Sequence, residues 1–268
     1  MFNLPEKPTP PELVNPKKLV IFSHPKVGKT TAVSLLQNNL NIDFEEGAGY
    51  VEGMSINIKK ILRDNPKENI LSVLTSLSNK LDEYYAKHGK WQYDYITIDT
   101  TTSLEDYCRP YANVLYKQTP MGKSYAGNSV INDLPNGGGY GYLRAAFENL
   151  LNTVDGKCNI CTILIAHSKD ASINRNGKDL QAKDVALTGK LKMIVCADAD
   201  GIGFMFRNPN NPNETILSFK THEQDLATGA RQAHISGREF KILTLQNPDY
   251  VEKNEARVFS TEWNKIFV

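Results

Sequence analysis

A segment near the amino terminus, Ser23 to Thr30, has the residue types of a loop that holds phosphate groups. It reads Ser-His-Pro-Lys-Val-Gly-Lys-Thr, and a second threonine follows it. Gly28 lets the backbone approach phosphate oxygens closely, and Lys29 can reach the two terminal phosphates of a nucleoside triphosphate. The hydroxyl of Thr30 is suited to bind Mg²⁺. The segment therefore predicts a site for nucleotide phosphates.

The phosphate contacts expected here come from the backbone as well as from side chains. The N–H groups of the loop lie at the start of a predicted helix and are expected to point at anionic oxygen atoms. The residues expected to hold the nucleotide are Ser23, Pro25, Lys26, Val27, Gly28, Lys29, Thr30 and Thr31. The usual pattern begins with glycine, where this chain has Ser23. Because Lys29 and Thr30 remain, we expect Ser23 to affect the rate of ATP hydrolysis more than the binding of the nucleotide.

A second candidate group, Asp99, ends the apolar segment 93–98, which is typical of a buried strand. An aspartate at this place in a phosphate-loop protein holds Mg²⁺, directly or through water. The pattern is weak when taken alone, because many strands end in aspartate. After a phosphate loop in an α/β array, it predicts that Thr30 and Asp99 form the metal site.

Hydrolysis also needs a group that orients or deprotonates the attacking water. Glu45 is the main candidate, because it ends a predicted strand and the carboxyl ends of parallel strands face the phosphate crevice. Glu46 and Asp43 are the alternatives, and Glu45 could also be a solvated carboxylate without a catalytic role. His167 ends another strand and is a candidate to sense the terminal phosphate, unless its role is structural. The predicted catalytic residues are thus Lys29, Glu45 and His167.

The elements that would position these groups alternate between strands and helices. Strands are expected at 18–22, 42–45, 91–99 and 159–166, and helices at 31–40, 56–62, 67–87, 103–116, 142–154 and 188–197. We expect Pro110 to kink or split its helix. Segments 119–141 and 168–187 have the composition of long irregular loops. Residues 201–207 and 215–221 predict a hairpin joined by a turn-rich connection.

This alternation predicts an α/β fold with a mainly parallel central sheet flanked by helices, and with an antiparallel C-terminal extension. The proline-rich residues 1–17 are expected to form a flexible arm. Residues 18–245 would form the ATPase domain, and residues 246–268 a C-terminal tail. No internal repeat divides the chain.

The composition is that of an ordinary globular protein. Apolar residues make up 40% and charged residues 23%, and no apolar run is long enough for a transmembrane helix. The polar amino terminus is unlike a signal peptide, and the four cysteines do not suggest a disulfide framework, so a cytoplasmic location is expected. Cys158 and Cys161 lack two further zinc ligands at matching spacing. A net charge of +1 neither requires nor excludes nucleic acid.

In their order along the chain, these segments resemble the core of RecA-like ATPases. Ile42–Glu45 resembles the strand that carries the catalytic glutamate of that core, and Ile98–Glu105 is similar to the Walker B segment of phage RecA-like ATPases. Ile165–Asp170 and Ala197–Gly201 are similar to two later segments of the same group. From Lys18 to Ile242, the chain resembles the phage NTP-binding proteins of the Sak-four type, which are short RecA-like single-strand annealing ATPases.

This resemblance implies a DNA-stimulated ATPase that uses ATP and Mg²⁺ and binds single-stranded DNA in phage recombination or replication, in the host cytoplasm. The DNA contacts would come from two segments, 107–144 and 168–192. The first has four basic residues and one acidic residue, and the second has six and three. The first also has six tyrosines, and aromatic faces beside cations suit stacked bases. Surface loops with tyrosines packed in the core are the alternative.

RecA-like ATPases act as rings or filaments in which a basic residue of one subunit reaches the nucleotide of its neighbour. The resemblance therefore implies a homo-oligomer, and Lys220, Arg231 and Arg238 are the candidates for this residue. A single-strand binding protein is a candidate partner, and no membrane contact is expected.

Two other functions fit the motifs. A nucleotide-gated binding module with little turnover is consistent with Ser23 and with the open role of Glu45. A small-molecule kinase also uses a phosphate loop, but it would need a lid that contains arginines. Residues 168–190 hold Arg175 as their single arginine, which argues against a kinase.

Overall fold

One sheet of eleven strands runs through the protein in the computed structural model, which describes residues 14–125, 131, 134, 137–175, 178–221 and 228–268. The strand order is β11-β10-β8-β7-β1-β5-β4-β2-β3, with β6 paired to β5 and β9 to β7. The strands are β1 (Lys18–Ser23), β2 (Asn39–Asp43), β3 (Met54–Asn57), β4 (Tyr95–Asp99), β5 (Cys161–Arg175), β6 (Lys178–Val185), β7 (Gly201–Arg207), β8 (Glu214–Ser218), β9 (Gly229–Ala230), β10 (Glu239–Leu245) and β11 (Phe259–Ser260). From β7 to β3 the strands of this order are parallel, and β8, β10 and β11 are antiparallel. The expected mainly parallel sheet with an antiparallel C-terminal extension is confirmed.

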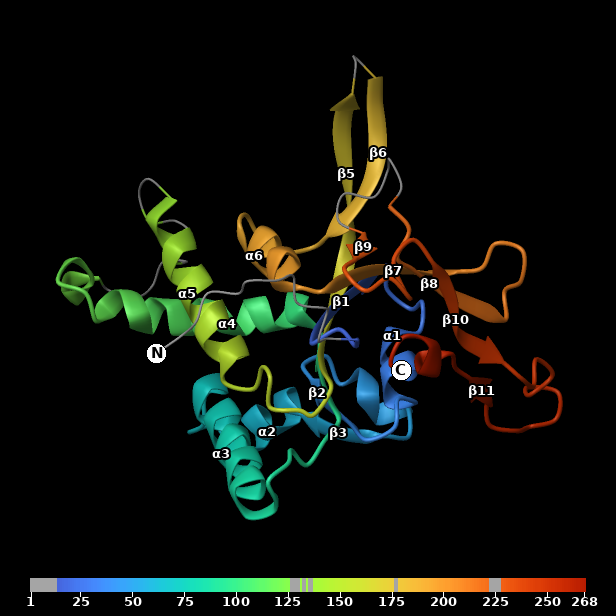
Figure 1. Cartoon of the computed structure of the whole chain (residues 1–268). Helices are drawn as coiled ribbons and strands as arrows, with labels where there is room; N and C mark the ends of the chain where they lie inside the picture. The colour runs from blue at the N-terminus through green and yellow to red at the C-terminus, as the bar shows by residue number, and fades with distance from the viewer. Residues whose placement is uncertain (1–13, 126–130, 132–133, 135–136, 176–177, 222–227) are drawn as a thin grey trace, which may run out of the picture.

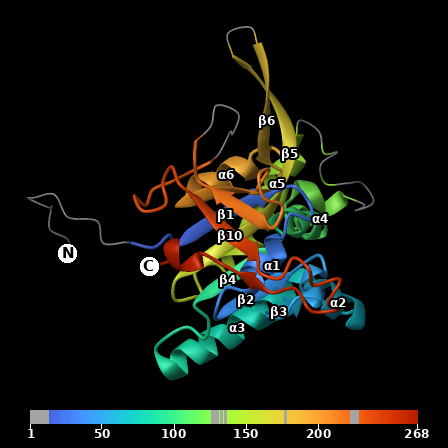
Figure 2. The same ribbon diagram turned by 90° about the vertical axis from the view of Figure 1, so that its right-hand side faces the viewer.

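Helices cover both faces of this sheet (Figures 1 and 2). They are α1 (Lys29–Ser34), α2 (Ile58–Asp64), α3 (Ile70–His88), α4 (Thr101–Lys117), α5 (Gly138–Asn152) and α6 (Leu191–Asp198), with the short 3₁₀ helices η1 (Gly47–Tyr50), η2 (Met121–Ser124) and η5 (Trp263–Lys265). Helices α2 to α6 contribute to one hydrophobic core, and α1 and η5 contribute to the other. The sheet is thus the middle layer of an α/β sandwich.

The continuous apolar run of β1 is explained by these two cores. Val20 and Phe22 belong to the core under α2 to α6, and Leu19 and Ile21 belong to the core under α1. Successive side chains of a strand point to opposite faces, so a central strand covered on both sides needs apolar residues at every position. This burial fixes the strand that carries the phosphate loop.

The expected helix at 31–40 is too long. Helix α1 ends at Ser34, and Asn38 has a positive φ of 54°. That turn sends the chain directly into β2, where Leu40 joins the core on the opposite face from Leu36. The spacing of Leu36 and Leu40 resembles the apolar stripe of a helix, although the two side chains belong to different cores. Strand β3 was not expected either; it is a largely exposed edge strand of four residues.

The expectation of an irregular segment at 168–187 is wrong. Strand β5 continues past the sheet as far as Arg175, and residues 168–175 pair with residues 178–185 of β6 as an antiparallel ribbon. Figure 1 shows this ribbon, the β5–β6 hairpin, standing out from the body of the protein. The sequence of this ribbon mixes charged and apolar residues without the alternation that predicts a strand, and even its buried residues include a carboxylate, Asp184, beside Ala182 and Val185.

Pro110 neither splits nor ends α4, which continues from Thr101 to Lys117. A proline removes one N–H group and leaves the carbonyl four residues earlier without its helical partner. Both Asp106 and Pro110 are exposed, so water can satisfy that carbonyl. In the expected loop at 119–141, η2 and the start of α5 are structured, and residues 126–130, 132–133 and 135–136 lie outside the described residues.

The segment 246–268, expected as a tail, packs against the sheet. Phe259 and Ser260 form β11 beside β10, and Trp263, Ile266 and Phe267 are buried beside α1. The indole Nε1 of Trp263 donates a hydrogen bond of 2.8 Å to the Ala32 carbonyl of α1. This packing ties the end of the chain to the helix that follows the phosphate loop.

Of the expected arm at 1–17, residues 1–13 lie outside the described residues. The described Asn15 exchanges two hydrogen bonds of 2.8 Å with the backbone of Val268. Within the described ranges, no helix combines the length and the apolar character that crossing a membrane requires.

Candidate nucleotide site

The candidate residues meet at the carboxyl ends of the parallel strands. Ser23 at the end of β1 pairs in register with His167 on β5, and Asp43 at the end of β2 pairs with Asp99 at the end of β4. Glu45 follows β2 by two residues. Strand β5, which carries His167, lies between β1, which carries Ser23, and β4, which ends at Asp99. Parallel strand ends share one edge of a sheet, which brings together groups far apart in sequence.

A cavity of about 920 Å³ lies over this edge. Its lining includes the loop from Pro25 to Thr31 together with Glu45, Asp99 and His167. Ser23 is fully buried and does not line the cavity, although it was expected to hold the nucleotide. The structure therefore brings the other sequence-predicted residues together around one space and places Ser23 beneath it.

The backbone of the loop turns at two left-handed positions, Lys26 with a φ of 64° and Gly28 with a φ of 108°. At Gly28, a Cβ atom would lie 3.0 Å from the Leu243 side chain of β10, so both φ and packing favour glycine. Helix α1 starts at the next residue, and its first N–H groups remain without helical partners. These amides are the donors that the sequence predicts for phosphate oxygens.

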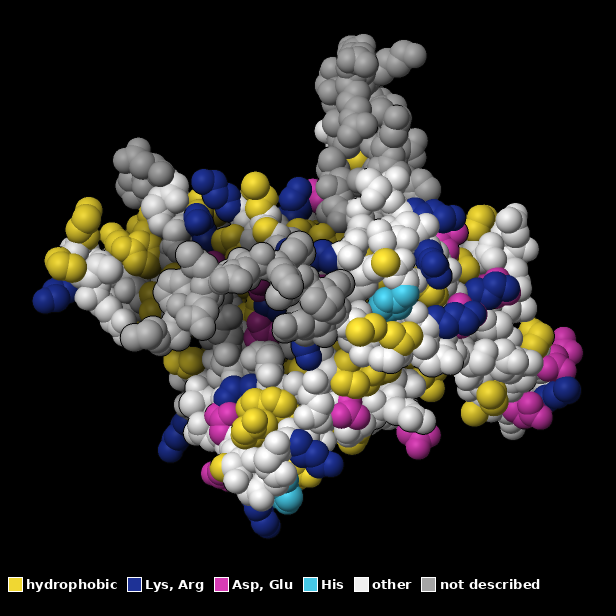
Figure 3. Space-filling model, viewed as in Figure 1, with side chains coloured by type: hydrophobic (Ala, Val, Ile, Leu, Met, Phe, Trp, Pro, Cys, Tyr) yellow, Lys and Arg dark blue, Asp and Glu magenta, His cyan; other side chains and the backbone are white. Residues whose placement is uncertain are grey.

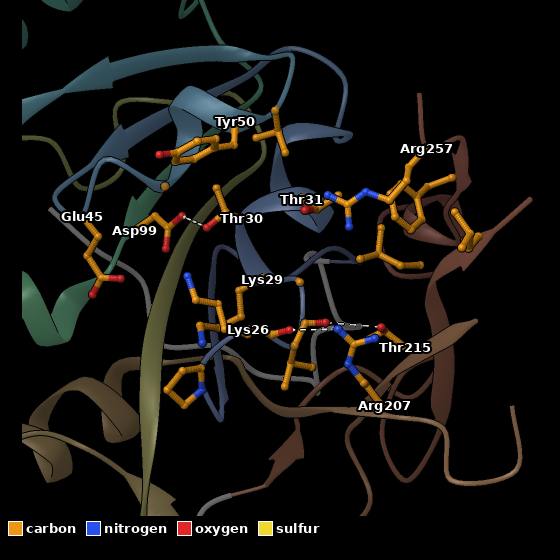
Figure 4. A pocket seen from close by; sticks show the side chains of 18 of the residues that line it. Lys26, Lys29, Thr30, Thr31, Glu45, Tyr50, Asp99, Arg207, Thr215 and Arg257 are labelled. Carbon is orange, nitrogen blue, oxygen red and sulfur yellow. Dashed lines mark hydrogen bonds between the residues drawn. The ribbon is translucent and has the colours of Figure 1, made fainter. Parts of the chain in front are cut away.

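The donors expected to hold Mg²⁺ are adjacent in the structure. Thr30 Oγ1 donates a hydrogen bond of 2.7 Å to Asp99 Oδ2, as Figure 4 shows. Burial and the neighbouring Asp43 and Glu45 raise the pKa of the Asp99 carboxyl. A hard divalent cation binds oxygen donors and lowers the cost of burying such carboxylates. The chemistry of Thr30 and Asp99 thus fits Mg²⁺.

Lys29 is buried at the floor of the site. Its Nζ donates to Ser23 Oγ at 3.0 Å and to the His24 carbonyl at 3.2 Å. Burial lowers the pKa of the Lys29 ammonium, while the nearby carboxylates of Asp99 and Glu45 act in the opposite direction. A phosphate chain would supply further negative charge to this ammonium.

Glu45 is the centre of a hydrogen-bond network. Its Oε1 lies 2.9 Å from His167 Nε2, and it accepts bonds of 2.7 Å from Thr100 Oγ1 and 2.6 Å from Ser103 Oγ. The hydrogen bond from His167 is the main cause that lowers the pKa of Glu45 to about 2. The sequence placed Glu45 and His167 in the same site, but it did not show that their side chains are joined.

The two alternatives to Glu45 have other partners. Asp43 is buried, and its two carboxylate oxygens accept 2.8 Å bonds from the backbone N–H groups of Glu45 and Ala48. Glu46 pairs with Lys59 at 3.4 Å and with Arg63 at 3.3 Å, both on α2. Asp43 therefore shapes the turn that carries Glu45, and Glu46 is neutralised by α2.

A further wall of the cavity was missed by sequence reasoning. It is made by the C-terminal strands and their connection, which we call the C-terminal wall: Leu243, Leu245, Pro248, Tyr250, Arg257 and Phe259. The Arg257 guanidinium lies 5.8 Å from the centre of the Phe259 ring, and Figure 4 shows Arg257 beside Thr31. Phosphate loops, strand ends and carboxylates have sequence signatures, whereas this wall depends on how the last strands fold back.

Arg207 was also missed. It ends β7, lines the cavity and donates a 3.1 Å bond to the Lys26 carbonyl. The three cations expected to act on a neighbouring subunit do not line the cavity. Lys220 pairs with Glu239 at 2.8 Å, and Arg231 pairs with Asp200 at 2.9 Å. Lys220, Arg231 and Arg238 therefore do not contribute to the nucleotide cavity of their own chain.

The first expected DNA segment is largely helical. Tyr107, Tyr111, Tyr116 and Tyr142 pack against the core, and Tyr125 contacts the ring of Tyr116. Tyr140 is the most exposed of the six, at 45%. It lines a groove between the starts of α5 and α6, together with Arg144 and Lys190. The aromatic surface available to a nucleic acid is thus much smaller than the tyrosine content suggested.

No protein of curated function matches the sequence. The sequence model of a family described as "AAA domain" matches residues 15–236. The chain belongs to the AAA domain family. The matched residues include the phosphate loop, Glu45, Asp99 and His167, and they identify this AAA domain as a P-loop NTPase. They end before β10, so the C-terminal wall lies beyond the matched residues.

Among solved structures, the AAA-domain chain is similar to a crystal structure of the RadB recombinase. The two are 12% identical, with a TM-score of 0.43, over 87% of this chain and 89% of that chain.

Proposed function

We propose that this AAA-domain protein is a RecA-like ATPase that binds single-stranded DNA and acts in phage recombination or replication by single-strand annealing. ATP and Mg²⁺ are the cofactors. The observation that carries the ATPase proposal is the arrangement of Lys29, Thr30 and Asp99 in one cavity with the Glu45–His167 pair. Each group has the chemistry that phosphoryl transfer to water requires.

The roles follow from the positions of the groups. The Lys29 ammonium binds the terminal phosphates and neutralises charge that develops on them. Thr30 and Asp99 would hold Mg²⁺, which when bound neutralises phosphate charge. Glu45 is ionised at neutral pH, because its pKa is about 2, and its carboxylate can orient the attacking water. Release of the hydrogen bond from His167, the main cause of the low pKa, would make Glu45 a stronger base.

The nucleoside is proposed to lie on the side of the C-terminal wall. In a phosphate loop the lysine reaches the β- and γ-phosphates. Glu45 and His167 are near this terminal-phosphate side, and Figure 4 shows Arg257 and Thr31 on the other side of the loop from Glu45. Apolar and aromatic residues with a few placed polar groups are the usual lining of a site for a nucleoside.

The proposal that DNA binds is supported by the continuity of β5. The strand carries His167 at the nucleotide cavity and then continues into the β5–β6 hairpin. A shift of His167 on loss of the terminal phosphate would therefore move the ribbon that follows it. In Figure 3, Lys and Arg side chains lie on both sides of the place where this ribbon leaves the body. Cations beside Tyr140 suit a single strand, whose bases stack and whose phosphates pair.

The test is ATP hydrolysis by the wild-type protein and by Lys29→Ala, with and without single-stranded DNA. We expect DNA to stimulate the wild type and Lys29→Ala to hydrolyse no ATP. Tyr140→Ala should reduce the stimulation, and Tyr85→Ala, which changes an exposed tyrosine on α3, should leave it unchanged. Equal rates of ATP hydrolysis with and without single-stranded DNA would contradict the DNA proposal. Failure of the wild type to bind nucleotide would contradict the ATPase proposal.

A nucleotide-gated binding module with little turnover is the second candidate. It is favoured by Glu45, whose Oε1 is engaged by His167, Thr100 and Ser103 rather than free to face water. A Glu45→Gln variant separates the two candidates. An unchanged rate of phosphate release would show that Glu45 is not catalytic and would support the binding module.

The proposed assembly is a ring or filament in which Lys220, Arg231 or Arg238 reaches a neighbour. It is supported by their position outside the cavity of their own chain. Sedimentation with and without ATP and DNA tests it, and a monomer under all conditions would contradict it.

A further inference from the structure

Ser23 stands where the phosphate-loop pattern has glycine, and its hydroxyl is bonded entirely within the loop. It is the last residue of β1 and is fully buried. Its Oγ donates a 2.7 Å hydrogen bond to the His24 carbonyl and accepts a 3.0 Å bond from Lys29 Nζ. The same Nζ donates to the His24 carbonyl at 3.2 Å. The hydroxyl, the carbonyl and the ammonium thus form a closed network.

This network uses two of the three hydrogens of the Lys29 ammonium. Glycine at position 23 would leave the His24 carbonyl in place but would remove the hydroxyl. The nearby carboxylates of Asp99 and Glu45 attract the ammonium electrostatically, but its hydrogen bonds among the described residues go to Ser23 and His24. The hydroxyl therefore adds one partner that a phosphate chain must displace or share.

We propose that Ser23 is a positioning residue that holds Lys29 against the base of the loop and lowers the affinity of the site for the β- and γ-phosphates. The inference rests on the proposed nucleotide-binding function. Ser23 acts through Lys29, because it is buried and does not line the cavity, so it cannot contact a phosphate itself.

The energetic reason is the loss of a charge-assisted hydrogen bond in a buried place. When Lys29 turns toward a phosphate, the Ser23 oxygen keeps its bond to the His24 carbonyl but loses the ammonium. Bonds to charged groups are stronger than neutral ones, and leaving a buried acceptor without a donor is costly. Phosphate binding must offset this cost, which a chain with glycine at position 23 does not have.

The test is titration with ATP, in the presence of Mg²⁺, of the wild type, Ser23→Ala and Ser23→Gly. We expect both variants to bind ATP about 10- to 100-fold more tightly, the range for release of one hydrogen bond to a charged group. Thermal unfolding of each variant shows whether the fold is retained. Ser23→Ala keeps the Cβ atom and the backbone preferences of a strand residue, so it is the main variant.

A double-mutant cycle shows whether the effect passes through Lys29. In a Lys29→Ala background, Ser23→Ala should leave the remaining ATP affinity unchanged. An equal gain in both backgrounds overturns the inference, because Ser23 would then act on the loop in general.

Other outcomes separate this inference from the proposed function. If the wild type and Ser23→Ala bind ATP with equal affinity, or Ser23→Ala binds more weakly, the role of Ser23 is overturned and the nucleotide-binding function remains. If neither protein binds ATP, both proposals fail together.

Discussion

The two sides of the nucleotide cavity are built by different parts of the sheet. The phosphate side uses the ends of the parallel strands β1, β2, β4 and β5, whose groups are held by partly buried hydrogen bonds such as that of Thr30 with Asp99. The C-terminal wall uses the antiparallel strands β10 and β11 and their connection, where Arg257 is exposed. Fixed polar groups suit chemistry on a phosphate, and an adaptable aromatic surface suits contact with a nucleoside. The proposed function therefore assigns catalysis and nucleoside recognition to separate regions of the cavity.

The largest effect is expected on the phosphate side. Glu45→Gln keeps the size of the side chain but removes the carboxylate, and we expect the turnover number to fall by about 10²- to 10⁴-fold, the usual contribution of a general base. ATP affinity should change little. Measurement of phosphate release checks this.

Glu46→Gln is the matched control for Glu45→Gln, because Glu46 is the next residue, lines the same cavity and pairs with Lys59 and Arg63. It should retain most of the wild-type rate. A larger loss in Glu46→Gln than in Glu45→Gln would reverse the assignment of the base.

The next effect concerns the anchor of the C-terminal wall. Trp263 is buried and donates to the Ala32 carbonyl, so Trp263→Ala should lower the free energy of unfolding by about 3–5 kcal/mol. Lys265→Ala, two residues away and exposed, is the control. Chemical denaturation checks both variants. A change below about 1 kcal/mol, the typical size for a surface site, would show that residues 246–268 are a detachable tail.

The contrast between the two sides also explains what the sequence could predict. Gly28, Lys29 and Thr30 form a local pattern with a fixed geometry, and Glu45, Asp99 and His167 each lie at the end of a segment that the sequence predicts to be a strand. Their meeting follows from parallel pairing, so they could be placed in one site without a structure.

The C-terminal wall could not be predicted in the same way. Arg257 and Phe259 reach the cavity because β11 pairs with β10 across the connection 246–258. The one turn signal in this connection, Asn247-Pro248-Asp249, does not fix the path of so long a segment. Strand β3 and the β5–β6 hairpin were missed for a related reason. Strand β3 is largely exposed, and the hairpin strands mix charged and apolar residues, so neither has the apolar alternation of a strand in its sequence.

A smaller effect should sharpen the division of roles. Arg257→Ala and Phe259→Ala should each weaken ATP binding by about threefold to tenfold, as expected for loss of one stacking or cation–π contact. Binding of inorganic triphosphate should be unchanged, because it lacks the nucleoside. Lys253→Ala, on the same connection, serves as the control. Equal losses for ATP and triphosphate would show that the wall contacts phosphates instead.

The smallest effect is a pH dependence. Folding lowers the pKa of Glu45 from 4.5 to about 2, so its stabilising contribution is present above pH 4.5 and is lost as the pH falls toward 2. The side chain is 36% exposed, which limits the contribution to below about 1 kcal/mol. The difference in unfolding free energy between wild type and Glu45→Gln should therefore shrink between pH 6 and pH 3. A difference that grows on acidification would contradict the observed network.

The central claim is that the cavity over the parallel strand ends binds ATP through Lys29. Its most direct measurement is titration of the wild type, Lys29→Ala and the control Lys60→Ala with ATP and Mg²⁺, because Lys60 is an exposed lysine on α2 outside the cavity. We predict saturable binding by the wild type and by Lys60→Ala, and a loss of about 100-fold or more in Lys29→Ala, as expected when a buried ammonium is removed from bound phosphates. Equal binding by all three proteins, or binding by none, would contradict the account.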